Sequence, residues 1–289
     1  GDEFVEAAAA AMREARRAGP GQLHWHIPAA PVDPRARIRT GTQILEAVQR
    51  HEFVVHYQPG VDLVSGIVVG VEALVRWHHP TDGLLPPDLF IPVAEATGSI
   101  LELGRWVLES ACAQAATWHQ QGLMLHMAVN LSTVQVADPD LLSTVAHILA
   151  KTGLNPHLLG FEVTESAMIT DAEKAVVVLN ALAALGASLS IDDFGTGYSS
   201  LVYLKRYPIQ ELKIDRAFVS GMGVNDEDDA IVASVIALAR AVRGTCVAEG
   251  IETPEQFAAL HALGCRYGQG WLFGKAVPAK ELPALAARC

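Results

Sequence analysis

Cysteine is scarce in this chain and never paired in sequence. The 289 residues contain four cysteines, Cys112, Cys246, Cys265 and Cys289, and no Cys-x-x-Cys motif. This spacing excludes a disulfide-based scaffold and a cysteine zinc site. We expect the four thiols to be small residues of a protein in a reducing compartment.

Basic residues are also few. The chain has 21 Lys and Arg against 32 Asp and Glu, which gives a formal net charge of −11. Binding DNA or RNA requires clustered basic side chains that neutralise many phosphates, so nucleic acid is excluded as a partner. A phosphate-bearing ligand would have to be held by metal ions or by one or two basic side chains.

Long apolar runs are missing as well. The closest approach, residues 230–239, is bounded by Asp229 and Arg240, and spanning a bilayer takes about 18 to 20 apolar residues. The start also lacks a charged-then-apolar secretion signal. We expect a cytoplasmic segment without membrane contact of its own, which an upstream region could still tether to a membrane.

The repeating order of apolar runs, amphipathic stretches and glycines predicts an α/β fold, a TIM-like (β/α)8 barrel. Strands are predicted at residues 53–57, 68–75, 125–131, 159–163, 188–191, 211–214, 245–248 and 267–272. Helices are predicted at residues 101–121, 140–152, 171–185, 226–242 and 254–263. Left-handed caps are expected after these helices, at Gly122, Gly153, Gly186, Gly244 and Gly264. Residues 60–66 are too short for a crossover helix, so the first strand should be antiparallel to the rest.

Residues 1–39 are predicted to form an N-terminal extension, followed by the barrel domain at residues 40–289. The first four residues are interpreted as a cloning remnant. Residues 5–18 are rich in alanine and end before Gly19-Pro20-Gly21, which predicts a helix. A short strand at residues 22–26 and a proline-containing linker at residues 28–37 are expected to follow.

Two adjacent aspartates, Asp192 and Asp193, stand where a predicted strand gives way to a glycine-bearing loop. Such carboxylates repel each other unless a cation lies between them. The alternative is an Asx-type turn in which one aspartate caps a helix beginning near Tyr198.

Matching groups at the other strand ends favour the cation. Each later strand ends in a polar or charged residue: Glu72, Asn130, Glu162, Asp192 with Asp193, Lys213, Glu249 and Gln269. The carboxyl ends of barrel strands converge on one mouth. Oxygen-rich ligand sets select hard cations such as Mg²⁺ or Mn²⁺, and paired ions are the usual means of cutting a phosphodiester.

Arg76 and Lys213 are the basic residues expected near this mouth. Arg76 suits a bidentate grip on a phosphate, and Lys213 could orient or deprotonate the attacking water. The alternatives are a salt bridge for Arg76 and an ion pair in the barrel core for Lys213.

The chain resembles the EAL-domain phosphodiesterases, which hydrolyse the bacterial second messenger cyclic di-GMP to linear pGpG. The resemblance covers about residues 40–289 and rests on Glu72-Ala-Leu-Val-Arg76, Tyr57-Gln-Pro59, Val129-Asn-Leu-Ser132, Glu162-Val-Thr-Glu-Ser166, Asp192-Asp-Phe-Gly-Thr-Gly-Tyr-Ser-Ser200, Leu212-Lys-Ile-Asp215, Glu249-Gly-Ile-Glu252 and Gln269-Gly270. Departures from the family pattern occur at Gly60, Trp271 and Ala276. They bear on substrate fit more than on chemistry.

The resemblance implies a role for each motif residue. Glu72, Asn130, Glu162 and Asp192 would hold one metal ion, and Asp192 and Asp193 the second. Glu249 and Gln269 would hold a metal ion or its water, and Lys213 would act on the water, so that Lys213, Glu249 and Glu72 are the candidate catalytic residues. Gln58, Arg76, Asp215 and Glu252 would contact the dinucleotide. Glu165 would anchor the loop at residues 194–200, whose position is coupled to dimerisation in this family. Plainer alternatives are a helix-entry residue for Glu165 and an ion-pair partner near Arg216 for Asp215.

The resemblance also implies two Mg²⁺ or Mn²⁺ ions per site, inhibition by Ca²⁺ and a homodimer. Residues 5–26 resemble the last helix and strand of a GGDEF diguanylate cyclase domain, which predicts an upstream GGDEF-like domain in the full-length protein. Two other functions stay open. One is a cyclic di-GMP receptor that binds without cutting, and the other is an enzyme acting on a different phosphodiester.

Overall fold

The computed structural model describes residues 34–165, 172–195 and 206–287. The helix and strand predicted in residues 5–26, and with them the GGDEF resemblance, lie outside this part of the chain. So do Tyr198 and Asp171, which the alternatives for Asp192-Asp193 and Glu165 invoke. The chain divides into two compact units, residues 1–40 and 41–289. The second unit contains the barrel.

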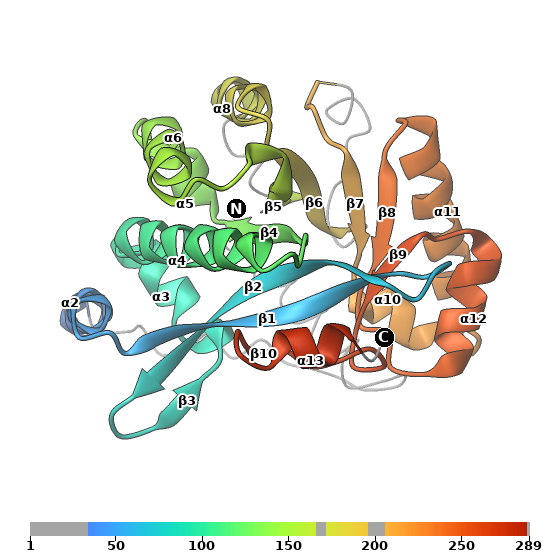
Figure 1. Ribbon diagram of the computed structural model, residues 1–289, viewed down its shortest axis with the longest axis horizontal. Coiled ribbons are helices and arrows are strands. Elements are labelled where there is room, and N and C mark those ends of the chain that lie inside the picture. The colour runs from blue at the N-terminus through green and yellow to red at the C-terminus, as the bar shows by residue number, and fades with distance from the viewer. Residues whose placement is uncertain (1–33, 166–171, 196–205, 288–289) are drawn as a thin grey trace. The chain divides into compact units, whose positions relative to one another are not determined.

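Eight strands close the barrel, as predicted. They are β1 (Phe53–Asp62), β2 (Val68–His79), β4 (His126–Leu131), β5 (Leu159–Thr164), β6 (Ser188–Phe194), β7 (Glu211–Ile214), β8 (Thr245–Ala248) and β9 (Tyr267–Gln269). Strand β1 pairs antiparallel with both β2 and β9, and every other neighbouring pair from β2 to β9 is parallel. The prediction of one antiparallel first strand is therefore confirmed (Figure 1).

Helices lie outside the barrel strands (Figure 1). They are α3 (Ile91–Thr97), α4 (Ile100–Gln120), α5 (Thr133–Val136), α6 (Leu141–Thr152), α8 (Ala172–Ala184), α10 (Arg216–Gly221), α11 (Asp226–Ala241), α12 (Pro254–Leu263) and α13 (Leu282–Ala286). Short elements complete the fold: β3 (Gly83–Leu85), β10 (Val277–Pro278) and the 3-10 helices η1 (Pro87–Leu89) and η2 (Pro156–Leu158). Among the described residues, no helix is both long and apolar enough to cross a bilayer.

Strand residues alternate between two different surroundings. Met127, Phe161, Leu189 and Leu212 are fully buried members of the hydrophobic core. The residues next to them, such as Glu162 and Lys213, face the barrel axis instead. Cys112, Cys246 and Cys265 are buried and unpaired, as the sequence predicts.

Strands β1 and β2 continue past their predicted ends at residues 57 and 75, to Asp62 and His79. Three further local predictions were wrong. Helix α2 (Pro34–Gln49) begins inside the predicted linker, since proline is tolerated in the first turn of a helix. Strand β9 ends at Gln269 rather than at residue 272, because a Cβ on Gly270 would lie 2.2 Å from the backbone of Ile251, so the chain turns there.

The third wrong prediction is the cap after α11. Arg243, and not Gly244, has the left-handed backbone there, with φ 62°. A Cβ on Gly244 would lie 2.9 Å from the carbonyl oxygen of Gln210. Gly244 is therefore required for close packing against the preceding strand connection.

Candidate active site

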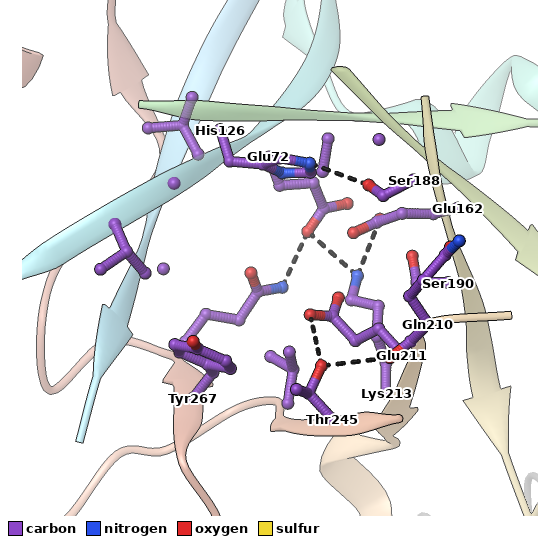
Figure 2. A pocket seen from close by; sticks show the side chains of 18 of the residues that line it. Glu72, His126, Glu162, Ser188, Ser190, Gln210, Glu211, Lys213, Thr245 and Tyr267 are labelled. Carbon is purple, nitrogen blue, oxygen red and sulfur yellow. Dashed lines mark hydrogen bonds and ion pairs between the residues drawn. The ribbon is translucent and has the colours of Figure 1, made fainter. Parts of the chain in front are cut away.

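A lysine surrounded by carboxylates occupies the barrel interior. Lys213 Nζ lies 2.7 Å from Glu162 Oε2 and 2.6 Å from Glu249 Oε1. It lies 3.6 Å from both Glu72 Oε2 and Asp192 Oδ1. We call these five residues the Lys213 cluster. They come from β2, β5, β6, β7 and the residue after β8, so these elements converge on one site. Figure 2 shows Glu72, Glu162 and Lys213 of this cluster.

Two amide side chains tie the cluster together from opposite sides. Asn130 Nδ2 donates to Glu72 Oε1 at 2.8 Å. Gln269 Nε2 donates to Glu72 Oε2 at 2.7 Å and to Glu249 Oε1 at 2.8 Å. Glu72 is thus the acceptor on which two strand ends meet.

Asp193 lies apart from the Lys213 cluster. Its backbone has a left-handed φ of 55°, and its N–H donates to Asp192 Oδ1 at 3.0 Å. The residue is exposed, yet the pKa of its carboxyl is raised to about 7 by shielding from water and by the neighbouring carboxylates of Asp215 and Asp192. The sequence places both aspartates at the mouth, and the structure brings Asp192 Oδ1 to 3.6 Å from Lys213 Nζ and the Asp193 carboxyl near that of Asp215.

The cluster has more negative charge than its single lysine compensates. Burial raises the pKa of Glu162 well above its usual value, and the nearby carboxylates of Glu72 and Asp192 add to the rise. Burial likewise raises the pKa of Glu249 to about 8. Burial would raise the pKa of Glu72 too, but Lys213, Gln269 and Asn130 lower it below its usual value.

Lys213 itself stays charged. Burial would lower the pKa of its ammonium, but Glu162, Glu249 and Glu72 raise it well above its usual value. The surroundings therefore favour the ionised form of Glu72, whereas burial disfavours the ionised forms of Glu162 and Glu249, which an additional cation would stabilise.

The fit of this site to a metal ion can be judged from its donor atoms. As the side chains stand, no three or more His, Cys, Asp or Glu residues in the described part of the chain are arranged to hold a metal. The reason is that the ammonium of Lys213 and the amide nitrogens of Asn130 and Gln269 lie among the carboxylates.

The chemistry of the donors nevertheless suits a hard cation. All the acids of the Lys213 cluster present oxygen, the ligand that Mg²⁺ and Mn²⁺ prefer. Glu162 Oε2 is buried without a hydrogen bond of good geometry, although Lys213 Nζ is close. A buried oxygen in this state gains from any cation that reaches it.

The predicted substrate-binding residues surround the cluster. Gln58 on β1 is the register partner of Glu72. Arg76 is four residues beyond Glu72 on the same strand, hence on the same face, and its Nη1 donates to the carbonyl oxygen of Val75 at 2.9 Å. No carboxylate of the described residues lies within ion-pair distance of Arg76, which argues against the salt-bridge alternative.

Three further predicted residues are placed differently from one another. Asp215 caps α10, its Oδ1 accepting from the N–H of Ala217 at 2.6 Å. Glu252 is exposed beyond β8. Glu165 is buried, and neither of its carboxylate oxygens has a hydrogen bond within the described residues. A buried, unsatisfied carboxylate beside residues 166–171 is compatible with its predicted anchoring role and does not test it.

A second polar layer, which the sequence did not predict, lies below the Lys213 cluster. His126, Ser188, Glu211 and Thr245 begin their strands and line a cavity of about 390 Å³ (Figure 2). His126 Nε2 is 2.9 Å from Ser188 Oγ. The available signal was the period of two: Ser188 and Glu211 precede Asp192 and Lys213 by even numbers of residues.

Known proteins are similar to this chain in sequence. The profile of the EAL domain matches residues 42–276. The bifunctional diguanylate cyclase/cyclic di-GMP phosphodiesterase MucR of Pseudomonas aeruginosa is 42% identical over 99% of this chain and 42% of its own length. The cyclic di-GMP phosphodiesterase NbdA of the same organism is 38% identical over 97% of this chain and 36% of its own length. The chain thus spans about two fifths of the length of these relatives.

A solved structure agrees in fold. The PaMucR phosphodiesterase in its c-di-GMP complex superposes with a TM-score of 0.81 and 45% identity, over 84% of this chain and 99% of the other.

Proposed function

The chain belongs to the EAL domain family, and we propose that it hydrolyses cyclic di-GMP to linear pGpG. The observation that carries the proposal is the Lys213 cluster, in which four carboxylates from different strands face one ammonium. The relatives named as cyclic di-GMP phosphodiesterases supply the substrate.

The site would be completed by two divalent cations, Mg²⁺ or Mn²⁺. Glu72, Asn130, Glu162 and Asp192 would hold one, Asp192 and Asp193 the other, with Glu249 and Gln269 beside them. When bound, such ions activate water and neutralise charge on the phosphate oxygens. The smaller Mg²⁺ and Mn²⁺ favour octahedral sites that Ca²⁺ does not fit as well, so Ca²⁺ is expected to inhibit.

The side chains of the protein would do the rest. Lys213 Nζ, charged and buried among carboxylates, would orient the attacking water by donating a hydrogen bond to it. Arg76 would grip a phosphate oxygen pair. Gln58, Asp215 and Glu252 would fix the guanine nucleotides. Glu165 would anchor the loop beyond β6. The homodimer and the upstream GGDEF-like domain expected from the sequence stay predictions.

Product analysis tests the proposal. Purified protein incubated with cyclic di-GMP and Mg²⁺ or Mn²⁺ should form pGpG, and Ca²⁺ should suppress it. Glu72→Gln should lower kcat by about 100-fold or more because it removes the charge on which Asn130 and Gln269 converge. The matched control is Glu255→Gln on the exposed first turn of α12, which should keep the rate.

Two other outcomes would contradict the proposal. Tight binding of cyclic di-GMP without product under either metal would identify a receptor instead. Faster cleavage of another cyclic nucleotide or phosphodiester would assign a different substrate.

A further inference from the structure

The cavity below the Lys213 cluster lies at the opposite end of the barrel from the mouth formed by the strand carboxyl ends. Its wall is built by residues at the amino ends of the parallel strands, including His126, Ser188, Glu211 and Thr245. Glu72, Glu162, Lys213 and Gln269 form its roof. We call this space of about 390 Å³ the lower cavity (Figure 2).

The lower cavity exists because the inward-facing side chains are small. Bulky branched residues normally fill the interior of such a barrel. Here Gly60, Gly70, Ala128, Gly160 and Ser190 line it instead. A Cβ on Gly160 would lie 2.4 Å from Cε1 of His126, so this glycine makes room for the histidine ring.

The charges of the lower cavity are mostly negative. Glu211 lies in its wall, with Thr245 Oγ1 3.5 Å from Glu211 Oε2, the limit of a hydrogen bond. Glu72 and Glu162 lie in its roof, and the cation there, Lys213, is already surrounded by the carboxylates of its cluster. Phosphate and other anions would therefore be repelled, whereas a cation would be attracted.

The remaining wall offers apolar surface and neutral polar groups. Val247 and Tyr267 are register partners on β8 and β9, and both line the cavity. Burial lowers the pKa of His126, so its ring is neutral at pH 7, and burial raises the pKa of Glu211, whose charge a bound cation would stabilise. Protein pockets that bind small molecules combine apolar surface with a few polar groups in this way, and their volumes start at about 300 Å³.

We propose that the lower cavity is a binding site for a small organic cation, whose ammonium or amidinium group contacts Glu211 and whose apolar body lies against Val247 and Tyr267. This site shares its roof with the proposed phosphodiesterase site, because Glu72, Glu162, Lys213 and Gln269 line the cavity, but its test does not depend on hydrolysis.

Benzamidine is the probe, because it combines an amidinium group with a flat ring. Calorimetric titration of the whole chain should show saturable binding with a Kd of about 1 mM or lower. Glu211→Gln, which keeps the size of the side chain, should weaken binding by about tenfold or more. Asp193→Asn, at the opposite mouth, is the matched control and should leave the Kd within about twofold.

Neutral benzamide tests the same point on the unmodified protein. It should bind at least about tenfold more weakly than benzamidine, since it lacks the charge. Three results would each overturn the proposal: no saturable binding of benzamidine, equal binding of benzamide and benzamidine, or a loss of affinity in Asp193→Asn but not in Glu211→Gln. The last would place the cation among the mouth carboxylates.

Discussion

The two ends of the barrel interior are both polar, but they are built on opposite plans. Around Lys213, four carboxylates lie within 3.6 Å of one ammonium, and amide donors from Asn130 and Gln269 bind the acids. Around the lower cavity, glycine, alanine and serine leave space. Within the part of the chain that the structure describes, the hydrogen-bond contact of the Glu211 carboxylate is the long one from Thr245.

The two sites differ in the number of charged groups and in the free volume that they contain. The Lys213 cluster holds four carboxylates close together in a buried site, which is the condition that raises the pKa of a carboxyl group. The lower cavity has fewer charges and more volume, which is the condition for accepting a small molecule. On our proposals, the first end would hold cations and carry out hydrolysis, and the second would bind a small organic cation.

The largest expected effect is on kcat, and it should come from removing the ammonium of the Lys213 cluster. Lys213→Met keeps the length of the side chain but leaves the cluster without its cation. We expect kcat for cyclic di-GMP hydrolysis to fall by about 10²–10³-fold, the usual loss when a preorganised charged donor is removed from the reacting atoms, while cyclic di-GMP binding is retained. Single-turnover rates and equilibrium binding measure the two quantities separately.

Lys151→Met is the control for this variant, since Lys151 is an exposed lysine paired with Glu109. Its rate should match that of the unmodified chain. Mg²⁺ should raise the melting temperature of Lys213→Met more than that of the unmodified protein, because the variant has a larger uncompensated charge. A Lys213→Met variant with full activity would remove the lysine from the mechanism.

The residues of the Lys213 cluster were predictable from sequence, because each of them can be recognised from the pattern of its own strand. Glu72, Asn130, Glu162 and Lys213 each end an apolar run, and the barrel topology brings such ends together. Two details were out of reach: the left-handed backbone of Asp193, and the sharing of Lys213 among several acids. Both depend on local geometry that spacing does not determine.

The lower cavity was not predictable in the same way. Gly160 and Ser188 are unremarkable within their own strands, and space arises only where small residues of several strands face each other. The end of β9 was missed for a related reason, because the close approach of Ile251 to Gly270 joins residues of two different strand connections. Both features, the lower cavity and the end of β9, depend on contacts between different elements and not on the residue pattern within one element.

An effect of intermediate size, on the free energy of unfolding, should distinguish residues that line the lower cavity from residues packed in the hydrophobic core. Ala128 lines the lower cavity, whereas Ala73 is 4% exposed and packed in the hydrophobic core. Ala73→Val should lower the free energy of unfolding by about 1–3 kcal/mol through overpacking. Ala128→Val should leave it unchanged or raise it by up to about 1 kcal/mol. Urea unfolding measures both, and equal losses would show that the cavity cannot accept a side chain.

The smallest expected effect is the contribution of His126, in the lower cavity, to the pH dependence of stability. Burial lowers the pKa of His126 below its usual value of 6.5. As the pH falls below 6.5, the unfolded chain takes up a proton on this residue that the folded chain does not, so stability present above pH 6.5 is lost on acidification. The loss from this one group is at most about 1.4 kcal/mol per pH unit, and it stops once the folded protein also binds the proton.

His126→Gln removes this contribution, and its amide can still reach Ser188, the present partner of the ring. The difference in unfolding free energy between the unmodified chain and the variant, measured in urea from pH 7.5 to 5.5, should therefore shrink as the pH falls. Other acidic groups titrate in both proteins and cancel in the difference. A constant difference over this range would mean that the folded protein protonates His126 as readily as the unfolded chain does, and hence that water fills the lower cavity freely around the ring.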